Sequence, residues 1–271
     1  MAKERKKPDK REAAQAKARK SAKRARDAPS PDNQPAGPGG FGTDDRPAVA
    51  ITVDVVVLAL HESRPCVLLV ERRRKPDRGS WALPGTVVDP DEGLTTAAAR
   101  AVAARTGVSV TSDRLEQLAA FGDPDRDPRT RVVSIGFLAV ADRATPPAGG
   151  EVASGRWWPL DEVMAKRGPA LAFDHRDILA SGMDHIRADL EWSDLATYML
   201  EEPFTLGDLR RAYEAVWGTL LEPANFRRKI LATPGFVDPT GELRKVTTGR
   251  PAELYERGAG VRLHPPLLRP G

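Results

Sequence analysis

Hydrophobic residues follow strand-like spacing through the first half of the chain. An apolar run at 50–60 predicts a strand buried on both faces, and a second run at 66–71 predicts its hairpin partner. Two more stretches, at 115–121 and 131–140, predict strands separated by a turn rich in Asp and Pro. A short strand is expected at 155–158. The pattern therefore predicts a sheet at the centre of the first domain.

Helical spacing interrupts these strands. Residues 93–106 predict a helix, and Gly107 stands where helices commonly end in a left-handed residue. The segment 79–85, bounded by glycines, predicts an irregular loop before this helix, and 160–166 predicts a shorter helix. Strands and helices interspersed in this way are typical of an α/β core.

A single apolar stripe follows this core. Residues 174–200 predict one long connector helix, because apolar positions recur there at helical spacing. The stripe consists of Ile178, Leu179, Met183, Ile186 and Leu190.

The C-terminal part of the chain predicts a helix-turn-helix followed by short strands. Thr205 is a suitable N-cap for the first helix, which ends at Gly218. A second helix is expected at 222–231, with Pro223 in its favoured first-turn position. The residues expected to point inward from it are Phe226, Ile230 and Leu231. The strands are expected at 236–238, 243–246 and 252–255, with a loop at 247–251.

Charge sets the start of the chain apart. The 271 residues carry a net charge of +4, but residues 1–28 hold twelve Lys and Arg against four acidic residues, a net charge of +8. Residues 1–46 contain almost nothing to bury, which predicts a disordered basic arm that either contacts phosphates or is a solvated tail. No apolar run is long enough for a membrane helix or a secretory signal, which predicts a cytoplasmic protein without membrane contact. The single cysteine, Cys66, excludes a disulfide framework within one chain.

The segment around the 79–85 loop carries a motif. Trp81-Ala-Leu-Pro-Gly85 is followed by the acidic pair Asp91-Glu92, by Arg100 in the predicted helix, and by Gly107 after it. This ordered set resembles the signature of the Nudix hydrolases, and the similarity extends loosely over residues 48–171. The resemblance implies an α/β/α sandwich.

The predicted helix lacks the carboxylates that Nudix catalysis requires. Hydrolysis of a diphosphate bond needs Mg²⁺, and the family supplies its oxygen ligands from glutamates on one helical face. When Arg100 is aligned with the family's arginine, Ala101, Ala104 and Arg105 occupy the glutamate positions. Only Glu92 remains, at a spacing one residue longer than usual. We therefore expect no catalytic residue, no metal and no cofactor.

A domain that has lost its metal site can still bind a nucleotide. A basic cluster at 71–75 precedes the motif, and arginines suit bidentate recognition of phosphate, while an aromatic ring can stack on a base. The same residues are also compatible with a solvated hairpin end and a core tryptophan. The candidate ligand-binding residues are Arg72, Arg74, Trp81, Phe121 and Arg131.

The second helix of the C-terminal unit has the composition of a recognition helix. One side is apolar, and the other presents arginine and asparagine, which read base edges and phosphates in DNA. The loop at 247–251 resembles the tip of a wing, suited to phosphates or the minor groove. A basic amphipathic helix is also compatible with an ordinary solvated surface. The candidate DNA-binding residues are Thr205, Asn225, Arg227, Arg228, Lys229, Lys245, Thr248 and Arg250.

Both halves together resemble the NrtR family, the Nudix-related transcriptional regulators of NAD metabolism. The resemblance covers about residues 48–257 and implies a homodimer that binds a palindromic operator in double-stranded DNA. It also implies repression of genes of NAD biosynthesis, with release of DNA when ADP-ribose or a related nucleotide occupies the Nudix domain. The segments that carry it are 171–176, 202–206, 212–215, 225–229, 249–251 and 254–255.

These observations predict an α+β chain in five parts, in which the Nudix-type sandwich precedes a winged helix-turn-helix domain. The parts are a disordered basic arm (1–46), a Nudix-like effector-sensing domain (47–172), a connector helix (173–201), a winged-helix DNA-binding domain (202–258) and a tail (259–271).

Two other functions stay open. The first is a Nudix hydrolase of a nucleoside diphosphate derivative, with relocated carboxylates such as Asp89, Asp91 and Glu92 and an accessory C-terminal domain. Magnesium-dependent release of AMP from ADP-ribose would identify it. The second is a protein that binds nucleic acid through the basic arm and takes no small ligand. Deletion of residues 1–46 would then abolish binding.

Overall fold

The computed structural model describes residues 48–111, 114–141, 155–245, 251–260 and 262–270. The chain divides into residues 1–48 and a compact unit formed by residues 49–271. The basic arm predicted at 1–46 lies outside the described ranges. Within those ranges, none of the helices has the length and apolar character needed to span a membrane.

A mixed sheet forms the centre of the first domain, as predicted. Strands β1 (Ala50–His61) and β2 (Arg64–Glu71) form an antiparallel hairpin, and β6 (Val132–Val140) runs parallel to β1. Strand β5 (Leu115–Phe121) pairs with β6 at the sheet edge. Eight consecutive residues of β1 are buried, because both faces of the sheet are covered.

The loop expected at 79–85 contains two short strands instead. Strand β3 (Trp81–Ala82) extends the sheet beside β2, and β4 (Gly85–Val87) pairs with β1. Strand β7 (Gly155–Pro159), which was predicted, pairs with β2. The irregular composition of 79–85 concealed these pairings, since two-residue and three-residue strands are fixed by their partners and carry no period of their own.

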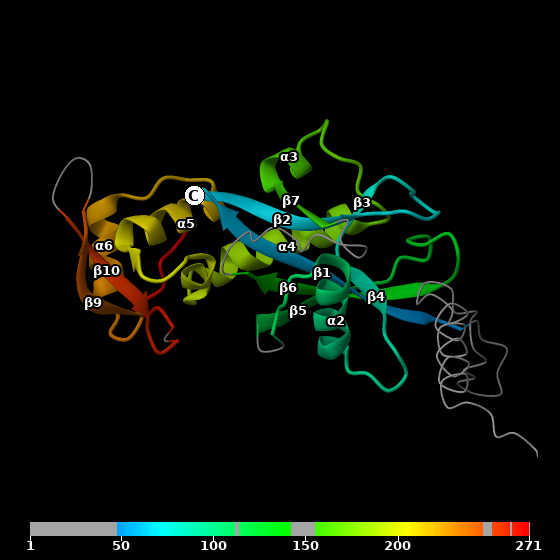
Figure 1. Cartoon of the computed structure of the whole chain (residues 1–271), viewed down its shortest axis with the longest axis horizontal. Coiled ribbons are helices and arrows are strands. Elements are labelled where there is room, and N and C mark those ends of the chain that lie inside the picture. Colours follow the sequence, from blue (N-terminus) through cyan, green and yellow to red (C-terminus); the bar gives the residue numbers. More distant parts are fainter. Residues whose placement is uncertain (1–47, 112–113, 142–154, 246–250, 261, 271) are drawn as a thin grey trace, which may run out of the picture. The chain divides into compact units, whose positions relative to one another are not determined.

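Helices cover both faces of the sheet. Helix α2 (Leu94–Thr106) packs on the face that includes Val53, Val55 and Val57, and its C-cap is Gly107 with φ 71°. Helix α4 (His175–Asp189) packs on the opposite face with the intervening residues of β1, and the short helix α3 (Leu160–Met164) follows β7. The predicted α/β/α sandwich is therefore present (Figure 1).

The connector differs from the single helix predicted for 174–200. Helix α4 ends at Asp189, and only a 3₁₀ turn (Leu195–Met199) follows before the next domain. Its apolar stripe, including Ile178, Leu179 and Ile186, is fully buried against the sheet. Helical spacing identified the buried face correctly, but it did not reveal the break after Asp189.

The C-terminal unit has the order expected of a winged helix. Helix α5 (Leu206–Trp217) and helix α6 (Pro223–Leu231) are followed by β9 (Val237–Arg244) and β10 (Ala252–Arg257), and β8 (Phe204–Thr205) completes a three-stranded sheet. The strands expected separately at 236–238 and 243–246 are one continuous strand. Its pairing with β10 shifts register around Gly241, which has φ 77°. The residues at this irregularity have a turn-like sequence, which is why two strands were predicted.

The predicted tail packs against the rest of this unit. Leu263 is 1% exposed and belongs to the same core cluster as residues of α4 and α5. Its N–H donates to the carbonyl of Trp192, and the N–H of Leu267 donates to the carbonyl of Glu191. The segment after β10 therefore returns to the link between the two domains.

Candidate functional site

Helix α6 presents a polar face to solvent. Phe226 and Ile230 are buried, and the Phe226 ring lies 5.4 Å from that of Tyr213 in α5. Asn225, Arg227 and Arg228 are exposed. Leu231 was expected to point inward but is 45% exposed. It lies about 100° around the helix from Ile230 and ends the helix, so it leaves the buried stripe.

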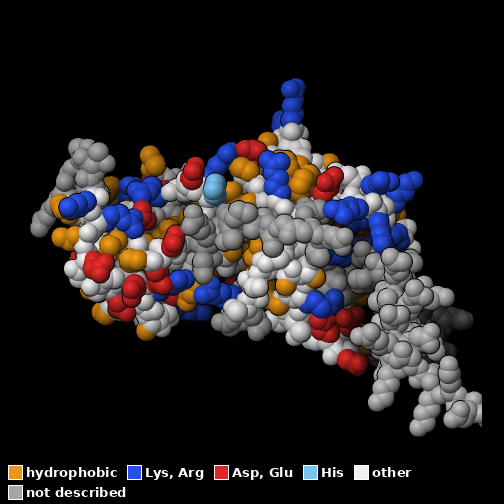
Figure 2. Space-filling view, in the orientation of Figure 1, with side chains coloured by type: hydrophobic (Ala, Val, Ile, Leu, Met, Phe, Trp, Pro, Cys, Tyr) orange, Lys and Arg blue, Asp and Glu red, His pale blue; other side chains and the backbone are white. Residues whose placement is uncertain are grey.

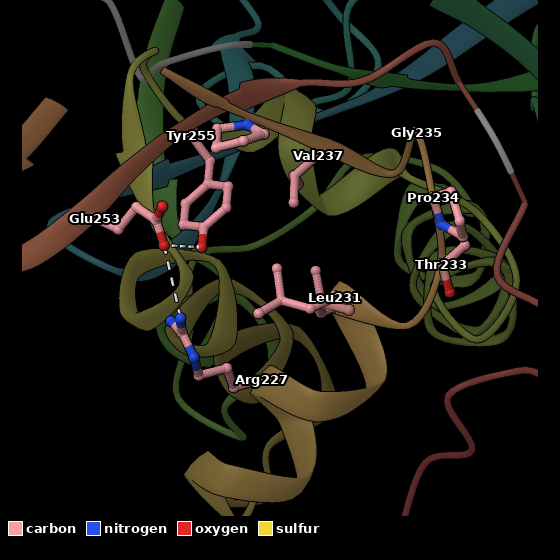
Figure 3. A pocket seen from close by; sticks show the side chains of 10 residues that line it. Arg227, Leu231, Thr233, Pro234, Gly235, Val237, Glu253 and Tyr255 are labelled. Carbon is pink, nitrogen blue, oxygen red and sulfur yellow. Dashed lines mark hydrogen bonds and ion pairs between the residues drawn. The ribbon is translucent and has the colours of Figure 1, made fainter. Parts of the chain in front are cut away.

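The exposed side chains of α6 differ in how firmly they are held. Arg228 donates to the amide oxygen of Asn225 at 3.0 Å. Arg227 lies 3.6 Å from the carboxylate of Glu253 in β10, which also accepts the Tyr255 hydroxyl (Figure 3). Lys229 donates to the carbonyl of Pro265 in the C-terminal segment. Of these described side chains, Arg227 and Lys229 are held by other segments of the chain, whereas Asn225 and Arg228 bond to each other within α6.

Thr205 has a structural role. It is 8% exposed, its hydroxyl accepts the N–H of Asp208 at 3.0 Å and donates to the Asp208 carboxylate at 2.8 Å, and together they form a capping box for α5. Burial alone would raise the pKa of Asp208, but the bonds from Thr205 and the nearby arginines hold it below its ordinary value. This capping role accounts for Thr205 without a DNA contact.

Of the three DNA-binding residues predicted in and beside the wing, the structure describes one. Lys245 is exposed just after β9. Thr248 and Arg250, which were also predicted to contact DNA, lie outside the described residues.

Arg100 of helix α2 binds the remaining glutamate of the motif, Glu92, which lies just before the helix. Arg100 forms a bidentate pair with Glu92 at 2.8 and 2.5 Å and also lies 3.2 Å from Asp89. The hydrogen bond from Arg100 holds the pKa of Glu92 below its ordinary value. Ala101 is buried in the helix–sheet core. In the part of the chain that the structure describes, no three His, Cys, Asp or Glu residues are grouped so that they could hold a metal ion.

A second cluster lies where β2, the β5–β6 loop and the start of α4 meet. The guanidinium of Arg72 lies 4.4 Å from the centroid of the Phe173 ring, and that of Arg129 lies 5.7 Å from it. Arg129 is anchored by a bidentate pair with the buried Asp127. Burial and the nearby Arg129 lower the pKa of Arg72. Lys and Arg side chains also gather over the adjoining β2–β3 turn in Figure 2.

Beneath this cluster lies a buried polar network. Arg126, whose side chain is 4% exposed, forms a bidentate pair with Asp174 at 2.8 and 2.6 Å. Asp54 accepts the Ser134 hydroxyl at 2.5 Å and lies 3.5 Å from Nε2 of His175. The network therefore ties β1, β6 and the β5–β6 loop to the first residues of α4.

His175 is neutral in this network. Its Nδ1 accepts the N–H of Leu83 at 2.9 Å, so the ring proton belongs on Nε2, which faces Asp54. Burial lowers the pKa of His175 below its ordinary value. The main chain at Gly85 passes so close that an added Cβ would lie 2.1 Å from the Asp54 carboxylate, which explains the glycine at this position of the motif.

The five predicted ligand residues do not form one cluster. Arg72 contacts Phe173, whereas Trp81 packs edge-on against Trp158 at 5.1 Å and is partly buried beside the core. Phe121 packs beside Gly136, and Arg74 is exposed on the β2–β3 turn. Arg131 donates to the carbonyl of Asp123 and lines the same pocket as Arg129 of the second cluster. Arg129 was expected, with Arg131, to flank a strand that could face the same cleft as the basic cluster, but Phe173 was not identified as a partner of Arg72, although it lies in a segment that carries the NrtR resemblance.

Two family models match the chain. The NUDIX domain matches residues 50–181, and the NrtR DNA-binding winged helix domain matches residues 196–256. Together they cover the sandwich and the C-terminal unit described above.

Three relatives extend this similarity. An ADPR responsive transcriptional repressor NtrR from Acinetobacter baylyi is 31% identical over 79% of this chain and 84% of its own length. An ADP-ribose pyrophosphatase from Methanocaldococcus jannaschii is 31% identical over 49% of this chain and 73% of its own length. The crystal structure of NrtR from Shewanella oneidensis with a 27mer DNA has 30% identity and a TM-score of 0.68, covering 80% of this chain and 99% of that one. This chain belongs to the NrtR family, in which a NUDIX domain precedes a DNA-binding winged helix.

Proposed function

We propose that this protein is a DNA-binding transcriptional repressor whose NUDIX domain responds to ADP-ribose. The observation that carries the proposal is the exposed polar face of α6, the second helix of a winged helix. Its Asn225 and Arg228 side chains are bonded to each other and, among the described residues, form no hydrogen bond or ion pair with another element. Such a helix enters the major groove and reads base edges with Arg and Asn. The DNA-bound relative from Shewanella supports this assignment.

The effector is proposed from the chemistry that two relatives share. One is named as responsive to ADP-ribose, and the other is named as an enzyme that acts on ADP-ribose. The NUDIX domain at residues 50–181 is the part of this chain that we propose to bind this ligand. We therefore assign a nucleoside diphosphate sugar as the ligand class, and ADP-ribose as the first compound to test.

We propose that the NUDIX domain binds this ligand without hydrolysing it. Ala101, Ala104 and Arg105 stand where the Nudix signature has glutamates, and Arg100 occupies the carboxylate of Glu92. A divalent cation would have to compete with this guanidinium for one carboxylate, and oxygen ligands are what Mg²⁺ requires. A sensor that does not consume its effector reports the effector's concentration directly.

The remaining parts of the proposal follow from the family resemblance. We propose a homodimer acting in the cytoplasm on a palindromic operator near genes of NAD biosynthesis, because two symmetric half-sites match a two-fold protein. Light scattering on the purified protein, alone and with operator DNA, measures this state. A monomer that binds a single half-site would contradict it.

The first test of the proposal is DNA binding. Fluorescence polarisation with DNA from the protein's own promoter region, at fixed salt, should show specific binding that ADP-ribose weakens. Replacing Arg228 by Ala should cost about 1–3 kcal/mol of binding free energy and relax base preference. Arg64→Ala removes the same charge from the β1–β2 hairpin and serves as the matched control. Equal losses in both variants would exclude base recognition by α6.

The alternative function is hydrolysis, favoured by the retained Glu92 and by the similarity to an ADP-ribose pyrophosphatase. The assay is release of AMP from ADP-ribose with Mg²⁺ or Mn²⁺. We expect no turnover above the level of a Glu92→Gln variant. If the wild type shows metal-dependent turnover and this substitution abolishes it, the protein is a hydrolase and the proposal of a non-hydrolysing sensor is wrong.

A further inference from the structure

Arg72 lies half-buried at the end of β2 with no carboxylate bonded to it among the described residues. Its Nε and Nη2 donate to the carbonyl of Pro76 at 3.1 and 2.9 Å. The neighbouring Arg126 and Arg129 each form a bidentate pair with an aspartate. A partly buried charge is costly unless it is paired, so Arg72 is suited to bind an anionic partner.

The partner must be an anion, because a second guanidinium lies nearby. Arg72 and Arg129 both approach the ring of Phe173, at 4.4 and 5.7 Å from its centroid. The two positive charges repel each other, and burial with this repulsion lowers the pKa of Arg72. An anion bound between them would remove the repulsion and could accept the Arg72 donors that the Pro76 carbonyl does not engage.

Phe173 is held rigidly for this role. Its φ of 51° is unfavourable for an aromatic residue and is maintained by Asp77, whose carboxylate accepts the Phe173 N–H at 3.2 Å. The two residues that follow Phe173, Asp174 and His175, are held by the buried polar network. The ring therefore offers a fixed apolar surface on which both guanidinium groups lie.

We propose that Arg72 and Arg129, lying over the ring of Phe173, bind the phosphate groups of the nucleotide effector. This inference rests on the proposed function for the identity of the ligand, and on the geometry of the cluster for its position. A diphosphate supplies adjacent anionic groups for two neighbouring guanidiniums. The ligand would then lie beside Phe173, the residue that precedes Asp174, the N-cap of α4.

The test measures ligand affinity by isothermal titration calorimetry on the full chain. The ligands are ADP-ribose, ADP, inorganic pyrophosphate and adenosine. Arg72→Gln should weaken ADP-ribose, ADP and pyrophosphate at least tenfold and leave any adenosine affinity unchanged. Arg72→Lys, which keeps the charge but loses the fork, should give a smaller loss. The matched control is Arg176→Gln. Arg176 is also half-buried, and its hydrogen bonds to described residues also go to main-chain carbonyls, those of Val163 and Met164.

Specific DNA binding in the absence of ligand shows that each variant is folded. Arg72→Gln should then stay on DNA at ADP-ribose concentrations that release the wild type. Wild-type affinity for ADP-ribose and ADP in Arg72→Gln would overturn this site while leaving the proposed function intact. If the wild type does not bind ADP-ribose, the proposed effector is wrong. The effect of Arg72→Gln on ADP and pyrophosphate affinity then tests the phosphate site by itself. Wild-type protein that binds none of these anions overturns the site as well.

Discussion

The ion pair between Arg126 and Asp174 lies almost entirely out of water. The Arg126 side chain is 4% exposed, and Asp174 meets it at 2.6 and 2.8 Å. Removal of one partner from such a pair leaves a buried charge, which costs about 3 kcal/mol or more. We expect Asp174→Asn to lower the free energy of unfolding by about 2–3 kcal/mol, because Asp54 at 3.7 Å still compensates part of the charge.

The matched control for this prediction is Asp161→Asn. Asp161 also forms a bidentate pair with an arginine, Arg64, but both side chains are largely exposed, and surface pairs contribute little. Urea unfolding followed by circular dichroism compares the two variants. Similar small losses in both would mean that water reaches Arg126.

His175 makes the stability of the protein depend on pH. Its pKa is lowered by burial, so the folded protein keeps it neutral while the unfolded chain takes up a proton below about pH 6.5. Stability from this residue is therefore complete above that pH and is lost as pH falls, by up to about 1.4 kcal/mol per pH unit.

Substitution isolates this contribution. In His175→Asn, an amide oxygen can still accept the N–H of Leu83, but no titrating group remains. We expect urea unfolding at pH 7.5, 6.5 and 5.5 to show a flatter pH dependence for this variant than for the wild type. Parallel curves would show that carboxylates, not His175, control this range.

Individual site residues could be predicted only where chemistry is visible along the chain. Arg72 lies in a basic run, and Asn225 with Arg228 on the polar side of an amphipathic helix, so composition indicated them. The contact between Arg72 and Phe173 joins residues a hundred positions apart and depends on a positive φ, which no local pattern predicts. The inward orientation expected for Leu231 was wrong because one residue beyond Ile230 turns the side chain by about 100° around the helix, out of the buried stripe.

At the scale of elements, the start of α5 is fixed by its capping box. Thr205 and Asp208 satisfy each other's backbone and side-chain groups. Thr205→Ala should therefore cost about 1 kcal/mol of stability, while Thr205→Ser should cost less. In both variants, DNA affinity measured well below the melting temperature should stay at the wild-type value. A selective loss of operator affinity in a fully folded Thr205→Ala variant would restore the DNA contact first predicted for this residue.

Helix α4 connects the two proposed binding sites. Its first residues follow Phe173, and near its other end Arg187 donates to the carbonyl of Val216 while the Trp217 indole donates to the carbonyl of Arg187. Two reciprocal bonds between α4 and α5 are suited to transmit a displacement, provided that ligand and DNA antagonise each other.

Trp217→Phe should reduce that antagonism. It removes the indole donor and keeps an aromatic ring in the core, so ADP-ribose and DNA should each still bind when offered alone. The fold-change in DNA affinity caused by saturating ADP-ribose should fall by more than half. Tyr213→Phe is the control, since it removes a buried donor of α5 that bonds to Ser193 and not to α4. An unchanged fold-change in Trp217→Phe would exclude this contact as the route.

Most elements could be predicted because their spacing is local. The buried run of β1 and the capped helices α2, α5 and α6 occur where the pattern placed them. The strands β3 and β4 could not be predicted, since each is defined by pairing with a strand elsewhere in the sequence. The break between α4 and the 3₁₀ turn was hidden because apolar residues continue through it.

At the scale of the whole unit formed by residues 49–271, one core cluster joins the two domains. It contains Val56 and Leu58 from the sandwich together with Phe226 and Tyr255 from the winged helix. Such continuity was not predictable from sequence, because each domain has its own periodic pattern. Since apolar burial provides most of the folding free energy, we expect these domains to unfold in a single transition.

Leu263 tests this cooperativity from the far end of the chain. It is 1% exposed in the shared cluster, whereas Leu268, five residues on, is 65% exposed. Leu263→Ala should lower the free energy of unfolding by about 2–5 kcal/mol, and Leu268→Ala by less than about 0.5 kcal/mol. Calorimetry should show one transition that moves to lower temperature in Leu263→Ala. If that transition instead separates into two, the sandwich and the winged helix are independent folding units, and effector binding must reach DNA by a route other than the shared core.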